Sequence, residues 1–118
     1  VTEVSLTFDQ NMQPAIAYVE AGATKFRYYD SVTRTYVTIT IPNAKNPLLT
    51  LDEKRDEFKG ISDILIFYIR GGAICHRVQR ERFEIEHTDY VLPPGESRLL
   101  SLGRNRGNRL QVYFRAVN

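Results

Sequence analysis

The segment Ser5-Leu6-Thr7-Phe8-Asp9 recurs as Leu48-Leu49-Thr50-Leu51-Asp52 and, in weaker form, as Leu99-Leu100-Ser101-Leu102-Gly103. The segments that follow these copies correspond as well, since 16–23 (IAYVEAGA) matches 66–73 (IFYIRGGA). A self-similarity of roughly 45–50 residues is typical of proteins that stack one structural unit several times. The repeat therefore predicts how the whole chain is organised.

We expect one domain, 1–118, that contains two full units and part of a third. The units are expected at 4–42, 47–90 and 98–118. The second unit is longer because of an insertion near residues 53–61.

The units show the period-two alternation of β-strands, and no long stretch shows the 3.6-residue period of an amphipathic helix. Residues 36–41 (YVTITI) are β-branched after an aromatic start, which favours a strand. Residues 64–69 (ILIFYI) form an unbroken apolar run, as in a strand covered on both faces. Residues 83–87 (FEIEH) alternate and are expected to form the last strand of the second unit. Each proline is expected between strands, at Pro14, Pro42, Pro47, Pro93 and Pro94.

These patterns predict an all-β fold in which antiparallel four-stranded meanders repeat about 2.5 times, each resembling a β-propeller blade. A β-sandwich of similar strands is the alternative. Because propellers usually need about four to eight blades, this chain cannot close a ring alone and is expected to expose sheet faces and edges. We expect that it either associates with further copies of itself or is cut from a longer protein.

Composition excludes several classes of protein. The 118 residues include 42% apolar and 25% charged side chains, as in an ordinary globular domain. The single cysteine, Cys75, excludes an intrachain disulfide and a cysteine-based zinc site. With only two histidines we expect no metal and no cofactor, and no apolar run is long enough to predict a membrane span.

The positive charge is concentrated at the C-terminal end, where 91–118 contain five arginines and one glutamate. Arg104, Arg106 and Arg109 lie in or beside the glycine-bounded segment 103–107. Arginine is enriched at protein interfaces, so we expect these three residues to contact a protein partner. A solvated hairpin and a contact with a phosphate backbone are the alternatives. The net charge of +2 and the absence of interleaved aromatic residues argue against nucleic acid.

A second candidate binding surface combines Arg27, Tyr28, Tyr29 and Tyr36, which could stack against a sugar or a nucleic-acid base. The chain has seven tyrosines and six phenylalanines, and most of them are expected in the core. Asp9 and Asp52 end equivalent strands, where an aspartate favours a turn stabilised by its own side chain over a ligand site.

The sequence offers little for catalysis. Cys75 and His76 are adjacent in an expected strand, so their side chains point to opposite faces and cannot act together. Glu84 and Glu86 could share a face as an acid–base pair for glycoside cleavage, but nearby arginines would lower their pKa values. We therefore expect no catalytic residues and no enzymatic activity.

Four segments carry a resemblance to a known family: 6–11 (LTFDQN), 63–70 (DILIFYIR), 77–83 (RVQRERF) and 103–111 (GRNRGNRLQ). Together they resemble the C-terminal part of a virion structural protein family of short-tailed and related bacteriophages. The resemblance covers most of the chain. It implies a non-enzymatic component of a phage tail or adsorption apparatus, made in the host cytoplasm and located in the virion. Its partners would be other copies of itself or other virion proteins.

The segments 8–11 (FDQN) and 14–18 (PAIAY) are also similar to propeller repeats of lectin-like and sialidase-like proteins. This similarity implies a carbohydrate-binding module as an alternative function, with a glycan on the host surface as its ligand. The regular Asp-box pattern of sialidases is missing, which again argues against an enzyme.

Overall fold

The computed structural model describes residues 1–52, 63–104 and 110–117, which form ten β-strands and one short 3₁₀ turn, Gln79–Glu81. Sheet A contains β1 (Thr2–Phe8), β2 (Pro14–Glu20), β3 (Ala23–Asp30) and β4 (Thr35–Pro42). Sheet B contains β5 (Ala44–Asp52), β6 (Asp63–Arg70), β7 (Ala73–Val78) and β8 (His87–Val91). A C-terminal hairpin contains β9 (Glu96–Arg104) and β10 (Leu110–Val117). All pairings are antiparallel between strands consecutive in the chain, which confirms the predicted fold of repeated four-stranded meanders.

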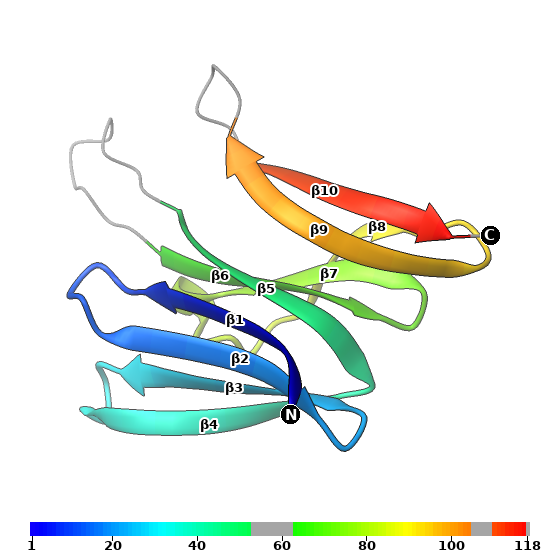
Figure 1. Ribbon diagram of the computed structural model, residues 1–118. Coiled ribbons are helices and arrows are strands. Elements are labelled where there is room, and N and C mark those ends of the chain that lie inside the picture. Colours follow the sequence, from blue (N-terminus) through cyan, green and yellow to red (C-terminus); the bar gives the residue numbers. More distant parts are fainter. Residues whose placement is uncertain (53–62, 105–109, 118) are drawn as a thin grey trace.

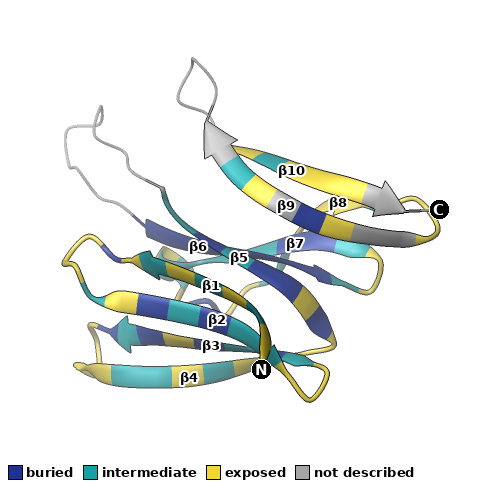
Figure 2. Cartoon of the chain, in the orientation of Figure 1, coloured by how far each residue is buried: buried dark blue, intermediate teal, exposed yellow. Residues whose placement is uncertain are grey.

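Sheet B is the middle layer of the stack, with sheet A on one side and the C-terminal hairpin on the other (Figure 1). One core lies between the sheets and includes Phe26, Ile41, Ile66 and Tyr68. A second core lies between sheet B and the hairpin and includes Phe67, Ile69 and Leu99. Seven successive residues of β6, from 63 to 69, are buried, as the dark strand in Figure 2 shows. This explains the unbroken apolar run of the sequence, because both faces of β6 are covered.

The first strands of the units lie beside one another in space, with β5 in contact with both β1 and β9. The backbone N–H of Leu49 donates to Ser5 Oγ (3.0 Å), and that of Asn46 donates to Glu3 Oε2 (3.2 Å). Glu3 and Asn46 occupy equivalent positions of the repeat, and both have positive φ (52° and 55°) where the strand register shifts. The first two units are therefore similar in backbone conformation at this position as well as in sequence. Open sheets stacked in this way fit a blade-like arrangement and also a sandwich.

Pro47 departs from the expectation that prolines lie between strands. It lies within β5, fully buried, at the register shift between Lys45 and Leu48. A bulge releases a residue from the ladder, so a residue without an N–H donor is accommodated there. Pro14 begins β2 and Pro42 ends β4, where a missing donor is also tolerated.

The strand predicted at 83–87 is wrong, because the fourth strand of sheet B begins only at His87. Arg82 and Phe83 both adopt left-handed backbone conformations, with φ of 55° and 57°, which interrupt an extended chain. The Phe83 ring instead enters the core between the sheets, where its centroid lies 4.7 Å from that of Phe26 and 4.6 Å from that of Tyr28. Burial of a large aromatic side chain outweighs the local alternation.

Within the described ranges, the structure contains no helix that is long and apolar enough to cross a membrane.

Candidate functional site

The face of sheet A that points away from sheet B carries an apolar patch. We call this surface the outer face of sheet A. Val4, Leu6 and Phe8 of β1 are 59%, 58% and 44% exposed there. Leu6 pairs in register with Ile16 of β2, which pairs with Arg27 of β3, so these side chains form one continuous surface.

The alternation of β1 is inverted relative to an ordinary surface strand, because its polar residues face the protein. Ser5 lies on the side of sheet B, where its hydroxyl accepts the Leu49 N–H. The apolar side chains on either side of it point to solvent instead. Single exposed apolar residues are normal, but a contiguous patch marks an interaction surface.

In the second unit of the repeat, the equivalent sheet face is covered by another layer, so its residues can be compared with those of the outer face of sheet A. Five positions of the outer face correspond to buried or partly buried residues of sheet B, and four of these counterparts, all except Pro47, belong to the core against sheet A. The corresponding pairs are Val4 and Pro47, Leu6 and Leu49, Phe8 and Leu51, Ile16 and Ile66, and Tyr18 and Tyr68. The outer face of sheet A thus has the composition of a surface that receives another sheet.

Three of the four residues predicted as a sugar platform meet on this outer face. The Arg27 guanidinium carbon lies 5.3 Å from the Tyr36 ring centroid, and the Tyr29 and Tyr36 rings are 5.4 Å apart at 74°. Arg27 and Tyr36 also line a shallow recess of about 380 Å³ together with Leu6, Pro14 and Ile16.

Tyr28 does not belong to that platform. Neighbouring residues of a strand point to opposite faces, so Tyr28 lies on the inner side of sheet A. It is 7% exposed and stacks on Phe26 with ring centroids 5.0 Å apart. Burial raises the pKa of the Tyr28 hydroxyl above its ordinary value.

The predicted arginine contact remains a prediction. Arg106 and Arg109 lie outside the described residues, and Arg104 is the last residue of β9 with a side chain that is not described. Asp52 is likewise the last residue of β5, and its side chain is not described.

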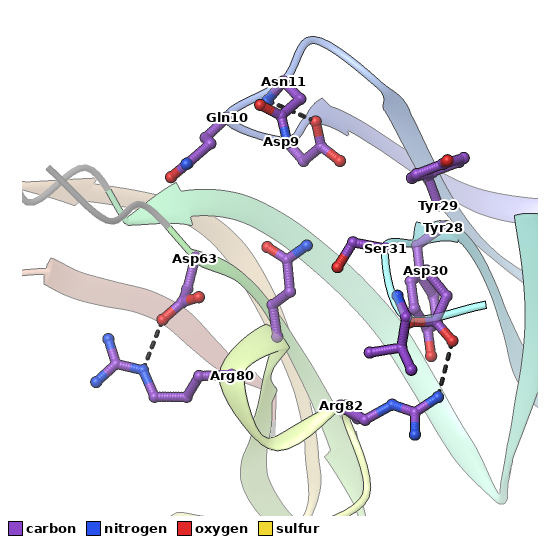
Figure 3. A pocket seen from close by; sticks show the side chains of 12 residues that line it. Asp9, Gln10, Asn11, Tyr28, Tyr29, Asp30, Ser31, Asp63, Arg80 and Arg82 are labelled. Carbon is purple, nitrogen blue, oxygen red and sulfur yellow. Dashed lines mark hydrogen bonds and ion pairs between the residues drawn. The ribbon is translucent and has the colours of Figure 1, made fainter. Parts of the chain in front are cut away.

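A second hollow, of about 440 Å³, lies at the end of the stack where several turns meet (Figure 3). We call it the turn-end pocket. Its walls come from the β1–β2 turn, the β3–β4 turn, the start of β6 and the segment 79–82. The described residues that line it are Asp9, Gln10, Asn11, Tyr28, Tyr29, Asp30, Ser31, Val32, Asp63, Gln79, Arg80 and Arg82.

Asp9 shapes the β1–β2 side of the turn-end pocket. Its Oδ1 accepts the backbone N–H groups of Asn11 and Gln13, both at 2.9 Å. This is the side-chain-stabilised turn that the sequence favours at this position. The turn holds Asn11 at the rim of the hollow (Figure 3).

Two ion pairs form the opposite wall. Arg82 Nη2 lies 2.8 Å from Asp30 Oδ2, and Arg80 Nε lies 2.6 Å from Asp63 Oδ2. Burial acts to raise the pKa of Asp30, but hydrogen bonds from the Val32 N–H and from Arg82 hold it below its ordinary value. The same carboxylate raises the pKa of the Arg82 guanidinium. Sequence reasoning missed these pairs, because Asp30 and Arg82 are 52 positions apart and no local pattern joins them.

The side chains weighed for catalysis have structural partners. Cys75 is buried between the sheets, and burial raises the pKa of its thiol. His76 points to the other face of β7, where Nδ1 lies 2.7 Å from Asp89 Oδ2, so the two side chains are separated as the sequence predicts. Glu86 accepts hydrogen bonds from Tyr68 (2.7 Å) and Arg70 (2.9 Å).

Glu84 is exposed and lies outside any strand, so it does not share a strand face with Glu86. Within the described part of the chain, no group of three or more His, Cys, Asp or Glu side chains is placed to hold a metal ion.

A scan of protein-family models finds no match to this chain, and comparisons with curated proteins and with solved structures find none either.

Proposed function

We propose that this chain is a non-enzymatic assembly protein that docks a further copy of itself on the outer face of sheet A. The observation that carries the proposal is the contrast within the repeat. Leu6 is 58% exposed, whereas its counterpart Leu49 is 9% exposed beneath sheet A.

Docking here continues a contact that the chain already makes twice, with sheet A on sheet B and sheet B on the C-terminal hairpin. No layer formed by residues 1–52, 63–104 and 110–117 lies on the outer face of sheet A (Figure 1). When identical chains contact one another through two different surfaces, they assemble head to tail. Such an assembly forms a ring if the rotation from one copy to the next brings the last copy back to the first. A ring would also cover the sheet faces that two and a half units leave open.

The energy available is appreciable. Complete burial of a leucine side chain is worth about 1.5–3 kcal/mol, and Leu6 keeps a little over half of its surface in water. Its docking should therefore contribute about 1–2 kcal/mol, which corresponds to roughly 5- to 30-fold in a dissociation constant.

The test is the mass in solution, measured by size-exclusion chromatography with light scattering. We expect a defined oligomer for the wild-type chain and a shift toward monomer for Leu6→Ser. Ile85→Ser is the matched control, because Ile85 is 50% exposed but lies in the loop before β8. A monomeric wild-type chain, or equal effects of the two substitutions, would contradict the proposal.

The setting that we propose for this assembly is a phage particle, in its tail or adsorption apparatus. It is supported by the resemblance of 6–11, 63–70, 77–83 and 103–111 to the virion protein family. Other virion proteins would then be further partners, and the arginines at 104, 106 and 109 would be available to contact them. Detection of the chain in purified particles, at a stoichiometry that matches its oligomer, tests this setting.

A further inference from the structure

The turn-end pocket has the size and construction of a small-molecule site. Its volume of about 440 Å³ lies within the range of roughly 300–1,000 Å³ that ligand pockets occupy. Its lining converges from segments as far apart in the sequence as Asp9 and Arg82 (Figure 3). None of this lining belongs to the apolar patch formed by Val4, Leu6 and Phe8.

Asp9 presents an unused acceptor to this pocket. The residue is only 7% exposed, and Oδ1 takes both of the backbone hydrogen bonds that hold the turn. Oδ2 accepts no hydrogen bond from a described residue. Because Oδ2 is not among the buried atoms that lack a partner, it is open to the pocket, where a ligand hydroxyl can donate a hydrogen bond to it in place of water.

The charges of the pocket argue against a simple ionic ligand. Arg82 and Arg80 are each within 2.8 Å of an aspartate oxygen, so no arginine that is described in the pocket carries an uncompensated charge for an anion. Among the described residues, no group of three or more His, Cys, Asp or Glu side chains could hold a metal ion, and Oδ1 of Asp9 already accepts two backbone N–H groups.

The remaining lining groups suit hydroxyls and one apolar face. Asn11 and Gln79 bring amides: that of Asn11 contains donors and an acceptor, and that of Gln79 contains two N–H donors beside an Oε1 that accepts the Ile64 N–H. Sugar hydroxyls also donate and accept. Tyr29 adds an aromatic ring at the edge of the hollow, of the kind that packs against the C–H face of a sugar ring.

From this geometry we propose that the turn-end pocket binds a neutral saccharide unit, with Asp9 Oδ2 accepting a hydrogen bond from a sugar hydroxyl and Tyr29 covering one face of the ring. This binding is separate from the docking of Val4, Leu6 and Phe8, and it centres on Asp9, whereas Tyr29 lies at the edge that the pocket shares with the outer face of sheet A.

The experiment is a titration of the ¹⁵N-labelled chain followed by amide chemical shifts. The probes are D-glucose, D-galactose and N-acetyl-D-glucosamine, with inorganic phosphate and putrescine as anionic and cationic comparisons. We expect at least one sugar at millimolar concentration to shift amides of 9–11, 28–32 and 79–82, and neither ion to do so. Absence of shifts with all three sugars, shifts confined to residues 4–8, or pocket shifts with only an ion would overturn the proposal.

Asp9→Asn is the informative variant. Asparagine keeps Oδ1 to accept the two backbone N–H groups of the turn, and it replaces the acceptor Oδ2 by an amide donor. We expect sugar affinity to fall by about tenfold or more, since a hydrogen bond to a charged group is worth about 1.5–3 kcal/mol. Glu20→Gln, at the exposed far end of β2, is the matched control and should bind as the wild type does.

Tyr29→Ala gives an independent test should the turn not tolerate the Asp9→Asn substitution. Tyr90→Ala is its control, because Tyr90 is 52% exposed on β8 and does not line the pocket. Equal affinity in Asp9→Asn, Tyr29→Ala and their controls would refute the assignment. The oligomeric mass of Asp9→Asn should match that of the wild type, because Asp9 is buried and lines the pocket rather than the outer face of sheet A.

Discussion

Replacement of Phe83 by alanine tests how the segment between β7 and β8 is built. The side chain is 1% exposed and makes edge-on contacts with Phe26 and Tyr28 in the core between the sheets. Truncation of a buried phenylalanine to alanine costs about 3–5 kcal/mol through lost burial and the cavity that remains. The positive φ of 57° is as unfavourable for alanine as for phenylalanine, so the measured change reports the ring itself.

Urea denaturation measures this loss. Domains are stable by about 5–15 kcal/mol, so Phe83→Ala removes a large share of the total. At a slope of about 1–3 kcal/mol per molar urea, the midpoint should fall by at least about 1 M. Ile85→Ala is the matched control, because Ile85 is 50% exposed two residues later, and it should change stability by about 0.5 kcal/mol or less.

Phe83→Leu keeps most of the buried volume and should cost no more than about 1.5 kcal/mol. A loss below about 1 kcal/mol for Phe83→Ala, with an unchanged slope, would refute the reasoning. It would mean that the ring is not inserted and that 83–87 is extended, as the sequence alternation predicts.

Two further predictions concern buried polar side chains, Tyr68 and Asp30. Tyr68→Phe should lower the free energy of unfolding by about 1–3 kcal/mol in urea denaturation, because it leaves Glu86 and Arg77 without the hydroxyl that bonds both of them. Tyr18→Phe, at the equivalent position of the repeat, should be near neutral, and equal effects at the two sites would contradict this account. Asp30 has a folded pKa below its ordinary value of about 4, so its contribution to stability is complete above that pH and is lost as the pH falls through the folded pKa. Asp30→Asn should therefore make the free energy of unfolding depend less on pH in this acid range, as measured by urea midpoints at a series of pH values. If the variant loses stability on acidification as the wild type does, the ion pair of Asp30 with Arg82 does not stabilise the fold.

Local patterns in the sequence were enough to predict most strands and the repeat. The alternation of β1 to β4 and the covered run of β6 are properties of adjacent residues, and period-two geometry converts them directly into strand faces. Because neighbouring residues of a strand point to opposite faces, Cys75 and His76 were correctly predicted to lie apart. The same rule places Tyr28 and Tyr29 on opposite faces, so the prediction that both belong to one sugar platform was wrong for Tyr28. The turn at Asp9 was also predictable, since its hydrogen bonds span only two and four residues.

The alternation of β1 shows that its two faces differ, and by itself it would favour Leu6 inside and Ser5 outside. The tertiary structure reverses this, because Ser5 meets the backbone of β5 while Leu6 stays 58% exposed, with no layer of the described part of the chain over it. Local pattern also failed at Phe83, where burial against β3 overrides alternation.

The sequence by itself determined that this protein is an all-β chain of about 2.5 repeated meanders, because strand period and turn residues act over a few neighbours. Only the tertiary structure decided which sheet face stays open and which turns enclose a pocket. Those features depend on contacts such as Asp30 with Arg82, whose distance in the chain leaves no periodic trace in the sequence.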